Sequence, residues 1–227
     1  RVPVVVQKPV QGQERKALTV SDDFSSDKLG LWWQWNHNPI DEAWSLTERP
    51  GYLRLKTNKV VPSIFHARNS LTQRMEGPTC QGTVALDLKH MKNGDVAGFS
   101  AFNSDAAVLA VSKRGGKLYL TMSEESVSLA NDTKAITGVK KNVKEEIQIK
   151  KNKIYFRIEG DFRPGETKDI VKCYYSLDNK KWHKIGPDYR TRFDWQRFFM
   201  GTKFAIFNYA TQKEGGYVDV DWFEFSK

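Results

Sequence analysis

Short runs in which apolar and polar residues alternate recur along most of the chain. In the segment 51–57, Leu53 and Leu55 alternate with Tyr52, Arg54 and Lys56. The same period of two recurs in the segments 83–89, 117–122, 147–149, 154–158, 171–175, 204–206 and 218–222. In the last segment the pattern places Val218, Val220 and Trp222 on one face. A period of two is typical of antiparallel strands with one buried face.

Turn residues separate these runs. Gly115-Gly116, Asn93-Gly94 and Asp178-Asn179 are pairs that favour tight connections between antiparallel strands. No stretch repeats apolar residues with the spacing of an amphipathic helix, and the polar segment 123–137 is predicted to be a loop. The pattern therefore predicts an all-β fold, a two-sheet antiparallel β-sandwich.

The first 16 residues differ from the rest in their pattern of apolar and polar residues. A short apolar run, 2–6, is followed by a polar stretch that contains Pro9 and Gly12, which indicates the end of one element and then a linker. We therefore place a boundary after residue 20 and assign 21–227 to the sandwich. The sequence opens with Arg1 and shows no signal peptide, so we expect a processed protein or a fragment.

Charge and cysteine content narrow the classes of function. The formal net charge is +9, but Lys and Arg are spread along strand-like runs, and no RNA-binding motif is present. We therefore expect no nucleic-acid partner. No apolar run reaches the ~20 residues of a membrane span, so we expect no membrane insertion. Cys80 and Cys173 allow either one disulfide or two buried thiols.

The sequence lacks the common catalytic motifs. There is no nucleophile elbow, no phosphate-binding glycine loop and no HExxH. A glycosidase needs two carboxyl groups that face each other, one of them protonated. The candidates by position lie mostly in polar loops, which favours a solvated role over catalysis: Asp41, Glu42, Glu124, Glu125, Asp194 and Glu214.

The segment 31–44 is the densest candidate for ligand binding, with four Trp in fourteen positions. One interpretation is a sugar-stacking platform. Its residues would be Trp33 and Trp35 for stacking, and Asn36, His37 and Asn38 for hydrogen bonds to hydroxyl groups. The other interpretation is that the rings are core residues beside a turn.

Two further candidates involve charged residues. Arg74, at the end of a predicted strand, could bind paired oxygens of a ligand, form an inter-domain salt bridge or simply be solvated. Asp219 and Asp221 alternate with apolar residues in the last strand, so they could hold calcium together with Asp22 or Asp23. The alternative is that these carboxylates are edge charges that discourage edge pairing.

Several long motifs, taken together, resemble the C-terminal module of family 43 glycoside hydrolases, the β-xylosidases and α-arabinofuranosidases. The motifs run in the family's order from about residue 21 to residue 225: SDDFSSDKLGLWWQWNHNP, WSLTERPGYLRLKT, ARNSLTQRMEGP, LDLKHMKNGDVAGFSAF, YYSLDNKKWHKIG and FMGTKFAIFNYATQKEGGYVDVDWFEF. The resemblance implies a concanavalin A-like sandwich (jelly roll) that packs on an N-terminal catalytic propeller. It also implies that residues 1–20 are a remnant of that catalytic domain plus a linker.

The resemblance carries further expectations. The catalytic carboxylates belong to the propeller, so we expect no catalytic residue and no activity in this chain alone. Phe198 or Phe199 is expected at the rim of the propeller's active site. A structural calcium is expected at Asp221 with Asp22 or Asp23. Xylan or arabinoxylan oligosaccharides are the expected ligands, and a secreted or periplasmic location is expected.

Two other functions stay open on the sequence. One is an autonomous xylan-binding module that uses the Trp-rich segment, and the other is a catalytic sandwich, either a hydrolase or a lyase. For a module separated from its propeller, we also expect an exposed apolar patch that favours self-association.

Overall fold

The computed structural model describes residue 12, residues 17–165 and residues 169–227. Most of the predicted remnant and linker, including the strand expected at 2–6, lies outside the described residues. The boundary after residue 20 therefore stays a prediction. Thr19 and Val20 are already fastened to the sandwich, because Thr19 Oγ1 donates to Arg74 O and Val20 N donates to Gln73 Oε1.

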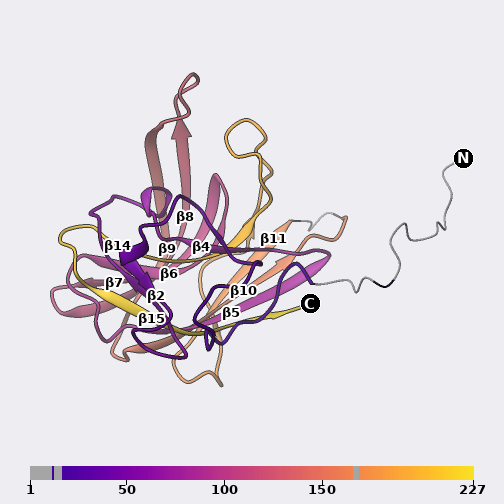
Figure 1. Ribbon diagram of the computed structural model, residues 1–227. Coiled ribbons are helices and arrows are strands. Elements are labelled where there is room, and N and C mark those ends of the chain that lie inside the picture. The colour runs from indigo at the N-terminus through magenta and orange to yellow at the C-terminus, as the bar shows by residue number, and fades with distance from the viewer. Residues whose placement is uncertain (1–11, 13–16, 166–168) are drawn as a thin grey trace, which may run out of the picture.

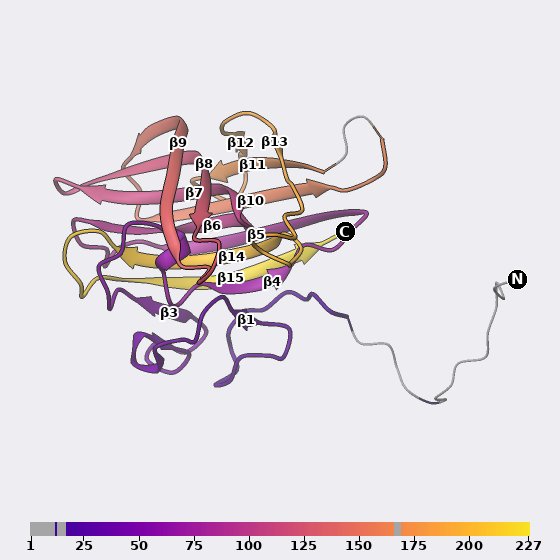
Figure 2. The same ribbon diagram turned by 90° about the horizontal axis from the view of Figure 1, so that it is seen from above.

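The described residues form two antiparallel sheets, which confirms the predicted β-sandwich (Figures 1 and 2). The front sheet has the order β1 (Gln34–Trp35), β4 (Leu71–Arg74), β14 (Lys203–Ala210), β6 (Asp95–Phe102), β7 (Asp105–Arg114), β8 (Lys117–Leu129) and β9 (Ile136–Ile149). The back sheet has the order β12 (His183–Lys184), β11 (Ile170–Ser176), β10 (Lys153–Asp161), β5 (Thr79–Asp87), β15 (Tyr217–Ser226), β3 (Leu53–Lys56) and β2 (Trp44–Ser45). β13 (Tyr189–Arg190) pairs with β11.

Helical structure in the described residues is limited to two short 3₁₀ turns, η1 (Asp41–Ala43) and η2 (Ile64–His66). No described helix is long and apolar enough to cross a membrane. The tight hairpin predicted at Gly115-Gly116 is present and joins β7 to β8.

The prediction of a loop at 123–137 was wrong. β8 continues to Leu129 and β9 begins at Ile136, and the two strands form a long hairpin that rises out of the sandwich (Figure 1). The alternation is hidden because some buried positions are polar. Ser123 and Glu125 are both buried and satisfy each other, with Ser123 Oγ donating to Glu125 Oε1 at 3.0 Å.

The main core lies between the sheets. Its largest members come from both layers, for example Phe99 and Phe204 of the front sheet and Phe156 and Phe223 of the back sheet, all at most 1% exposed. Phe99 and Phe204 stack with ring centroids 5.5 Å apart.

A second core covers the other face of the front sheet. The segment 58–70, which contains η2, lays Ile64 and Phe65 over Phe102 and Phe207. The ring centroids of Phe65 and Phe102 lie 5.5 Å apart. Every residue of β6 is consequently buried, so the front sheet is covered on both faces along this strand.

A β-bulge in β15 changes which face its last aromatic residue occupies. The pairing of β15 with β5 shifts register between Val220 and Trp222, which leaves Asp221 as the extra residue. Trp222 therefore turns to the outer face, opposite Ala85, and Phe223 takes the next core position. The sequence pattern was wrong for Trp222, because a bulge shifts the alternation by one residue.

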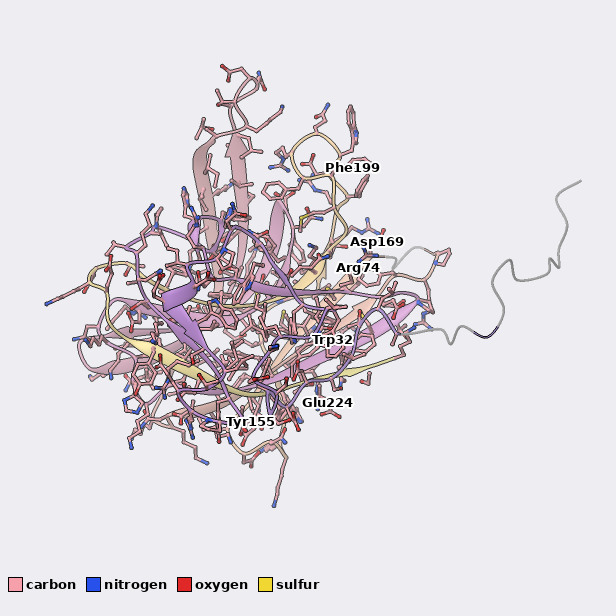
Figure 3. All side chains as sticks on the ribbon, viewed as in Figure 1. Trp32, Arg74, Tyr155, Asp169, Phe199 and Glu224 are labelled. Carbon is pink, nitrogen blue, oxygen red and sulfur yellow. The ribbon has the colours of Figure 1, made fainter. Side chains whose placement is uncertain are left out.

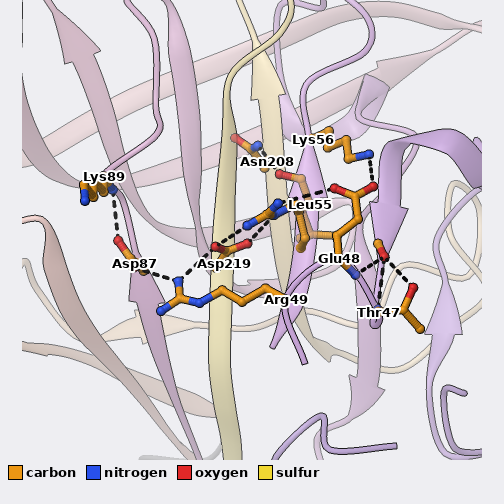
Figure 4. A network of polar contacts seen from close by, with 11 residues as sticks. Thr47, Glu48, Arg49, Leu55, Lys56, Asp87, Lys89, Asn208 and Asp219 are labelled. Carbon is orange, nitrogen blue, oxygen red and sulfur yellow. Dashed lines mark hydrogen bonds and ion pairs between the residues drawn. The ribbon is translucent and has the colours of Figure 1, made fainter. Parts of the chain in front are cut away.

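The outer face of the back sheet carries an ion-pair network around Asp219 (Figure 4). The Asp219 side chain is only 1% exposed, and the Arg54 fork donates to it from Nε at 2.7 Å and Nη2 at 2.9 Å. Arg49 Nη1 lies 2.9 Å from both Asp219 Oδ2 and Asp87 Oδ2. Burial alone would raise the pKa of Asp219, but the hydrogen bonds from Arg54 and Arg49 outweigh it and lower the pKa. This network fastens β3 and the 45–52 loop to the central strands.

We predict that Asp219→Asn lowers the free energy of unfolding by about 2–3 kcal/mol at pH 7, because it removes a buried charge that two guanidinium groups share. The folded-state pKa is below the ordinary 3.8, so the stabilisation is present above that value and is lost as pH falls through the folded pKa. Urea unfolding of both proteins at pH 7 and near pH 2 measures this. Asp161→Asn, which breaks an exposed pair with Arg163, is the control and should leave stability unchanged.

The two cysteines are free and buried, so the thiol alternative is confirmed. They lie on β5 and β11, which β10 separates, and their register partners on β10 differ, Gly160 for Cys80 and Ile158 for Cys173. Burial raises the pKa of Cys80 to about 11 and that of Cys173 to about 12.

We predict that neither thiol reacts rapidly with Ellman's reagent in the native protein, because the thiolate is the reactive species. After unfolding in guanidinium chloride, absorbance should report both cysteines of the chain. Cys80→Ser should remove one equivalent from the unfolded protein and nothing from the native one. Rapid reaction of a native thiol would contradict the described burial.

Candidate functional site

The segment 191–202, here called the aromatic loop, joins β13 to β14 and carries the most exposed cluster of rings in the described residues. Phe193, Trp195 and Phe199 are 62%, 66% and 83% exposed. The rings of Phe193 and Phe199 meet edge to face with centroids 5.6 Å apart. The loop projects on the same side of the molecule as the β8–β9 hairpin (Figure 1), and Phe199 lies towards that end in Figure 3.

Ion pairs hold the aromatic loop against the front sheet. Arg197 Nη1 donates to Val127 O at 2.6 Å, and the same guanidinium pairs with Asp194 and Asp105. Arg192 Nη2 lies 2.6 Å from Asp105 Oδ2. A hydrogen bond from the Arg197 backbone N–H, together with the Arg197 side chain, lowers the pKa of Asp194 despite partial burial. The exposed rings therefore stand on an anchored base.

The structure distinguishes the two phenylalanines that were expected at an active-site rim. Phe198 is partly buried against the second core, and its N–H donates to Asp194 O at 3.0 Å. Phe199 projects into solvent. Of the two, Phe199 is the residue whose ring is free to contact another molecule.

The Trp-rich segment is mostly structural. Trp33 is 7% exposed, its Nε1 donates to Asp22 Oδ2 at 2.8 Å, and its ring packs between Phe24 and Phe223. A sugar ring therefore has no access to Trp33. Trp35 is partly buried against Trp44, with centroids 5.2 Å apart.

The polar residues beside the Trp cluster fasten one turn to the second core. Asn36 N donates to Ser70 O at 2.9 Å, and His37 Nε2 lies 3.0 Å from Phe65 O. Asn38 O accepts a hydrogen bond from Arg68 Nε at 3.0 Å.

Arg74 is exposed at the end of β4, beside Lys203 on β14. Burial and the nearby Arg74 charge lower the pKa of Lys203. A sugar-binding role for these residues stays a prediction.

The carboxylates expected to bind calcium do not converge. Asp22 accepts hydrogen bonds from Trp33 and from Phe24 N, and Asp23 Oδ1 accepts from Ser25 N and Oγ. Asp221 Oδ2 instead pairs with Lys153 Nζ at 2.6 Å. Within the described ranges, no three acidic, His or Cys side chains are placed to share a metal ion. Each of these carboxylates is engaged with another partner, and the calcium site stays a prediction.

Three of the carboxylates considered for catalysis are engaged in ion pairs. Glu125 and Glu124 pair with Lys141 at 3.0 Å and Lys144 at 2.9 Å, and Asp194 pairs with Arg197. The hydrogen bonds from Arg197 lower the pKa of Asp194 and favour its ionised form, whereas a glycosidase also needs a protonated carboxyl group. The second core also covers the outer face of the front sheet over β6, β7 and β14.

Two antiparallel sheets, a filled front face and an exposed, anchored loop define a concanavalin A-like β-sandwich whose most conspicuous candidate surface is a loop rather than a catalytic cleft. Comparison with known proteins identifies the family. Residues 21–226 match the model described as "Beta xylosidase C-terminal Concanavalin A-like domain", and the chain belongs to this family.

The relatives are glycoside hydrolases. The chain is 32% identical to the β-xylosidase of Formosa agariphila over 96% of its own length but spans only 37% of that protein. An engineered family 43 glycoside hydrolase with both endo-xylanase and exo-arabinofuranosidase activity matches at 31% identity with a TM-score of 0.85. The match covers 97% of this chain and 44% of that one. A bifunctional GH43-CE protein of Bacteroides eggerthii matches at 39% identity with a TM-score of 0.80. The match covers 91% of this chain and 25% of that one.

Sequence reasoning missed two exposed rings, Phe193 and Trp195, and the anchor Asp105. The signal for the rings was present, since the run RFDWQRFF is as rich in aromatic residues as the Trp-rich segment. The anchor carried no such signal, because Asp105 meets Arg192 and Arg197 only after the chain has folded.

We predict that Arg197→Met loosens the aromatic loop without unfolding the sandwich. The substitution keeps an apolar stem but removes the bonds to Val127, Asp105 and Asp194. Hydrogen–deuterium exchange should rise in peptides covering 193–202, while the melting temperature stays close to that of the wild type. Arg163→Met, at an exposed pair elsewhere, should leave exchange in this loop unchanged; equal exchange in both variants would contradict an anchoring role.

Proposed function

We propose that this sandwich is the non-catalytic accessory module of a family 43 glycosidase acting on xylose- or arabinose-containing polysaccharides, and that it docks on the catalytic domain through the aromatic loop. The observation that carries the proposal is the cluster of Phe193, Trp195 and Phe199, exposed by 62%, 66% and 83% on an anchored base. Large exposed rings of this kind are typical of protein–protein contacts.

The build of the loop supports a protein partner. Arg197 and Asp105 limit its motion before binding, so little conformational entropy is lost on docking. Phe199 is the most exposed of the three rings, and we therefore assign it to the rim of the partner's active site. Docking of the rings would also remove the apolar surface that the separated module exposes.

The alternative of a catalytic sandwich has less support. Glu124, Glu125 and Asp194 are ion-paired, and the front face is filled by η2. The accessory role accordingly places the acid and base of hydrolysis on the partner domain, and this chain supplies shape and stability.

We predict that the purified chain releases no product from p-nitrophenyl β-xyloside or α-arabinofuranoside. When it is mixed with the family 43 catalytic domain encoded in its own gene, the wild type should form a stoichiometric complex in sedimentation velocity. The double variant Trp195→Ser, Phe199→Ser should weaken that complex at least about tenfold, because central aromatic residues dominate most interfaces.

Leu31→Ser supplies the matched control, since Leu31 is 99% exposed on a different segment and should not affect the complex. At high concentration without its partner, the wild-type chain should self-associate and the double variant should do so less. A gene without a catalytic domain, or a complex indifferent to the loop variants, would overturn the proposal.

A further inference from the structure

The outer face of the back sheet bears a second group of aromatic residues, on the side away from the aromatic loop. Central strand β5 presents short side chains there, and its neighbours β10 and β15 present long ones. In register, Ala85 lies between Tyr155 and Trp222, and Thr83 lies between Arg157 and Glu224. We call this surface the β5 platform.

Two rings form the centre of the β5 platform. Tyr155 and Trp222 are both half-buried, and their centroids lie 6.1 Å apart at an interplanar angle of 34°. They close over Ala85, which is 0% exposed. Trp222 is here only because the bulge at Asp221 turns it outward. Bulges are known to re-aim side chains next to functional sites.

A third ring extends the platform along the next row. The Arg157 guanidinium lies 3.8 Å above the Trp182 ring, and its Nε donates to Thr83 Oγ1 at 3.4 Å. Stacking on the ring and this hydrogen bond fix the position of the guanidinium beside Trp182. The row thus combines an apolar ring with a fixed guanidinium group.

The face becomes hollow beyond this row. A depression of about 530 Å³ has mixed walls, and its lining includes Thr79, Gln81, Glu159, Asp161, Lys172 and Ser226 together with Cys80 and Ile170. Glu159 and Ser226 flank Gln81 in register, so the hollow continues the line of β5. From Ala85 to Thr79 this line is about 20 Å long at the usual rise per strand residue.

We propose that the β5 platform and its hollow bind a neutral polysaccharide chain, as a glycan site separate from the aromatic loop. Rings that are half-buried and flanked by hydrogen-bonding groups suit the apolar faces and hydroxyl edges of sugar rings. Charge supports a neutral ligand: along the platform and its hollow, the cations Arg157, Lys172 and Lys227 lie among the carboxylates Glu159, Asp161, Asp188 and Glu224, so neither sign dominates. The net charge of +9 is therefore not concentrated here, which disfavours nucleic acid and acidic glycans.

The position of the β5 platform allows it to bind a glycan while the aromatic loop is docked on another domain. Figure 3 shows Tyr155 and Glu224 at the opposite end of the molecule from Phe199. A catalytic domain docked on the aromatic loop would leave the β5 platform open to solvent. The inference goes beyond the proposed function and uses the family only to choose probes.

Affinity gel electrophoresis and calorimetry on the purified chain test the inference, with wheat arabinoxylan, xyloglucan, mixed-linkage β-glucan and xylohexaose as neutral probes and polygalacturonate as the acidic probe. At least one neutral polysaccharide should retard the wild type. Trp222→Ala and Tyr155→Ala should each weaken that binding about tenfold or more, the scale of losing one stacked ring. Trp222→Phe should retain most of it.

Leu31→Ala, at a residue that is 99% exposed and belongs to neither aromatic surface, is the control and should bind like the wild type. Circular dichroism identifies any variant that fails to fold; the two alanine variants lie on different strands, so either alone decides the matter. Lack of retardation by every neutral probe, unchanged binding by a folded alanine variant, or stronger retardation by polygalacturonate would each overturn the proposal. None of these outcomes bears on docking of the aromatic loop, which is measured with the catalytic domain.

Discussion

Burial of the front sheet on both faces is the constraint on which the rest of the structure depends. β6 and β14 carry apolar residues towards the back sheet and also towards the opposite side, where Phe102 and Phe207 need cover. The segment 58–70 supplies it with Ile64 and Phe65. Apolar area removed from water contributes about 25 cal/mol per Å², so leaving this face open would be costly. The covered face is unavailable to a ligand, and the remaining candidates are loops and the outer face of the back sheet.

The strands that were predicted best from the sequence are those with one face exposed to solvent. β3 and β10 alternate clearly because their outward residues meet solvent or the ion-pair network. β6 shows no alternation, because the side chains on both of its faces are buried. The β8–β9 hairpin was missed for a different reason. Glu125 is buried against Ser123 and pairs with the exposed Lys141, whereas a carboxylate in the sequence is typical of a loop.

Candidate sites were harder to predict than strands, because ring content alone does not reveal exposure. The Trp-rich segment and the aromatic loop look alike in composition, yet Trp33 is held by Asp22, Phe24 and Phe223 while Phe199 touches little beyond Phe193. Contacts of this range form only in the folded chain. Trp222 adds a second kind of error, since one extra residue in β15 reverses its face.

The two aromatic surfaces are built for different partners. Rings of the aromatic loop protrude, and the polar groups beneath them, Arg197 and Asp105, are already paired with one another. Burying these rings together against another apolar surface would stabilise a complex. Rings of the β5 platform are half-buried and lie beside charged side chains, as Trp182 does beside Arg157. Polar groups there keep donors and acceptors in contact with water, which suits a ligand that is hydrated along its edges and apolar on its faces.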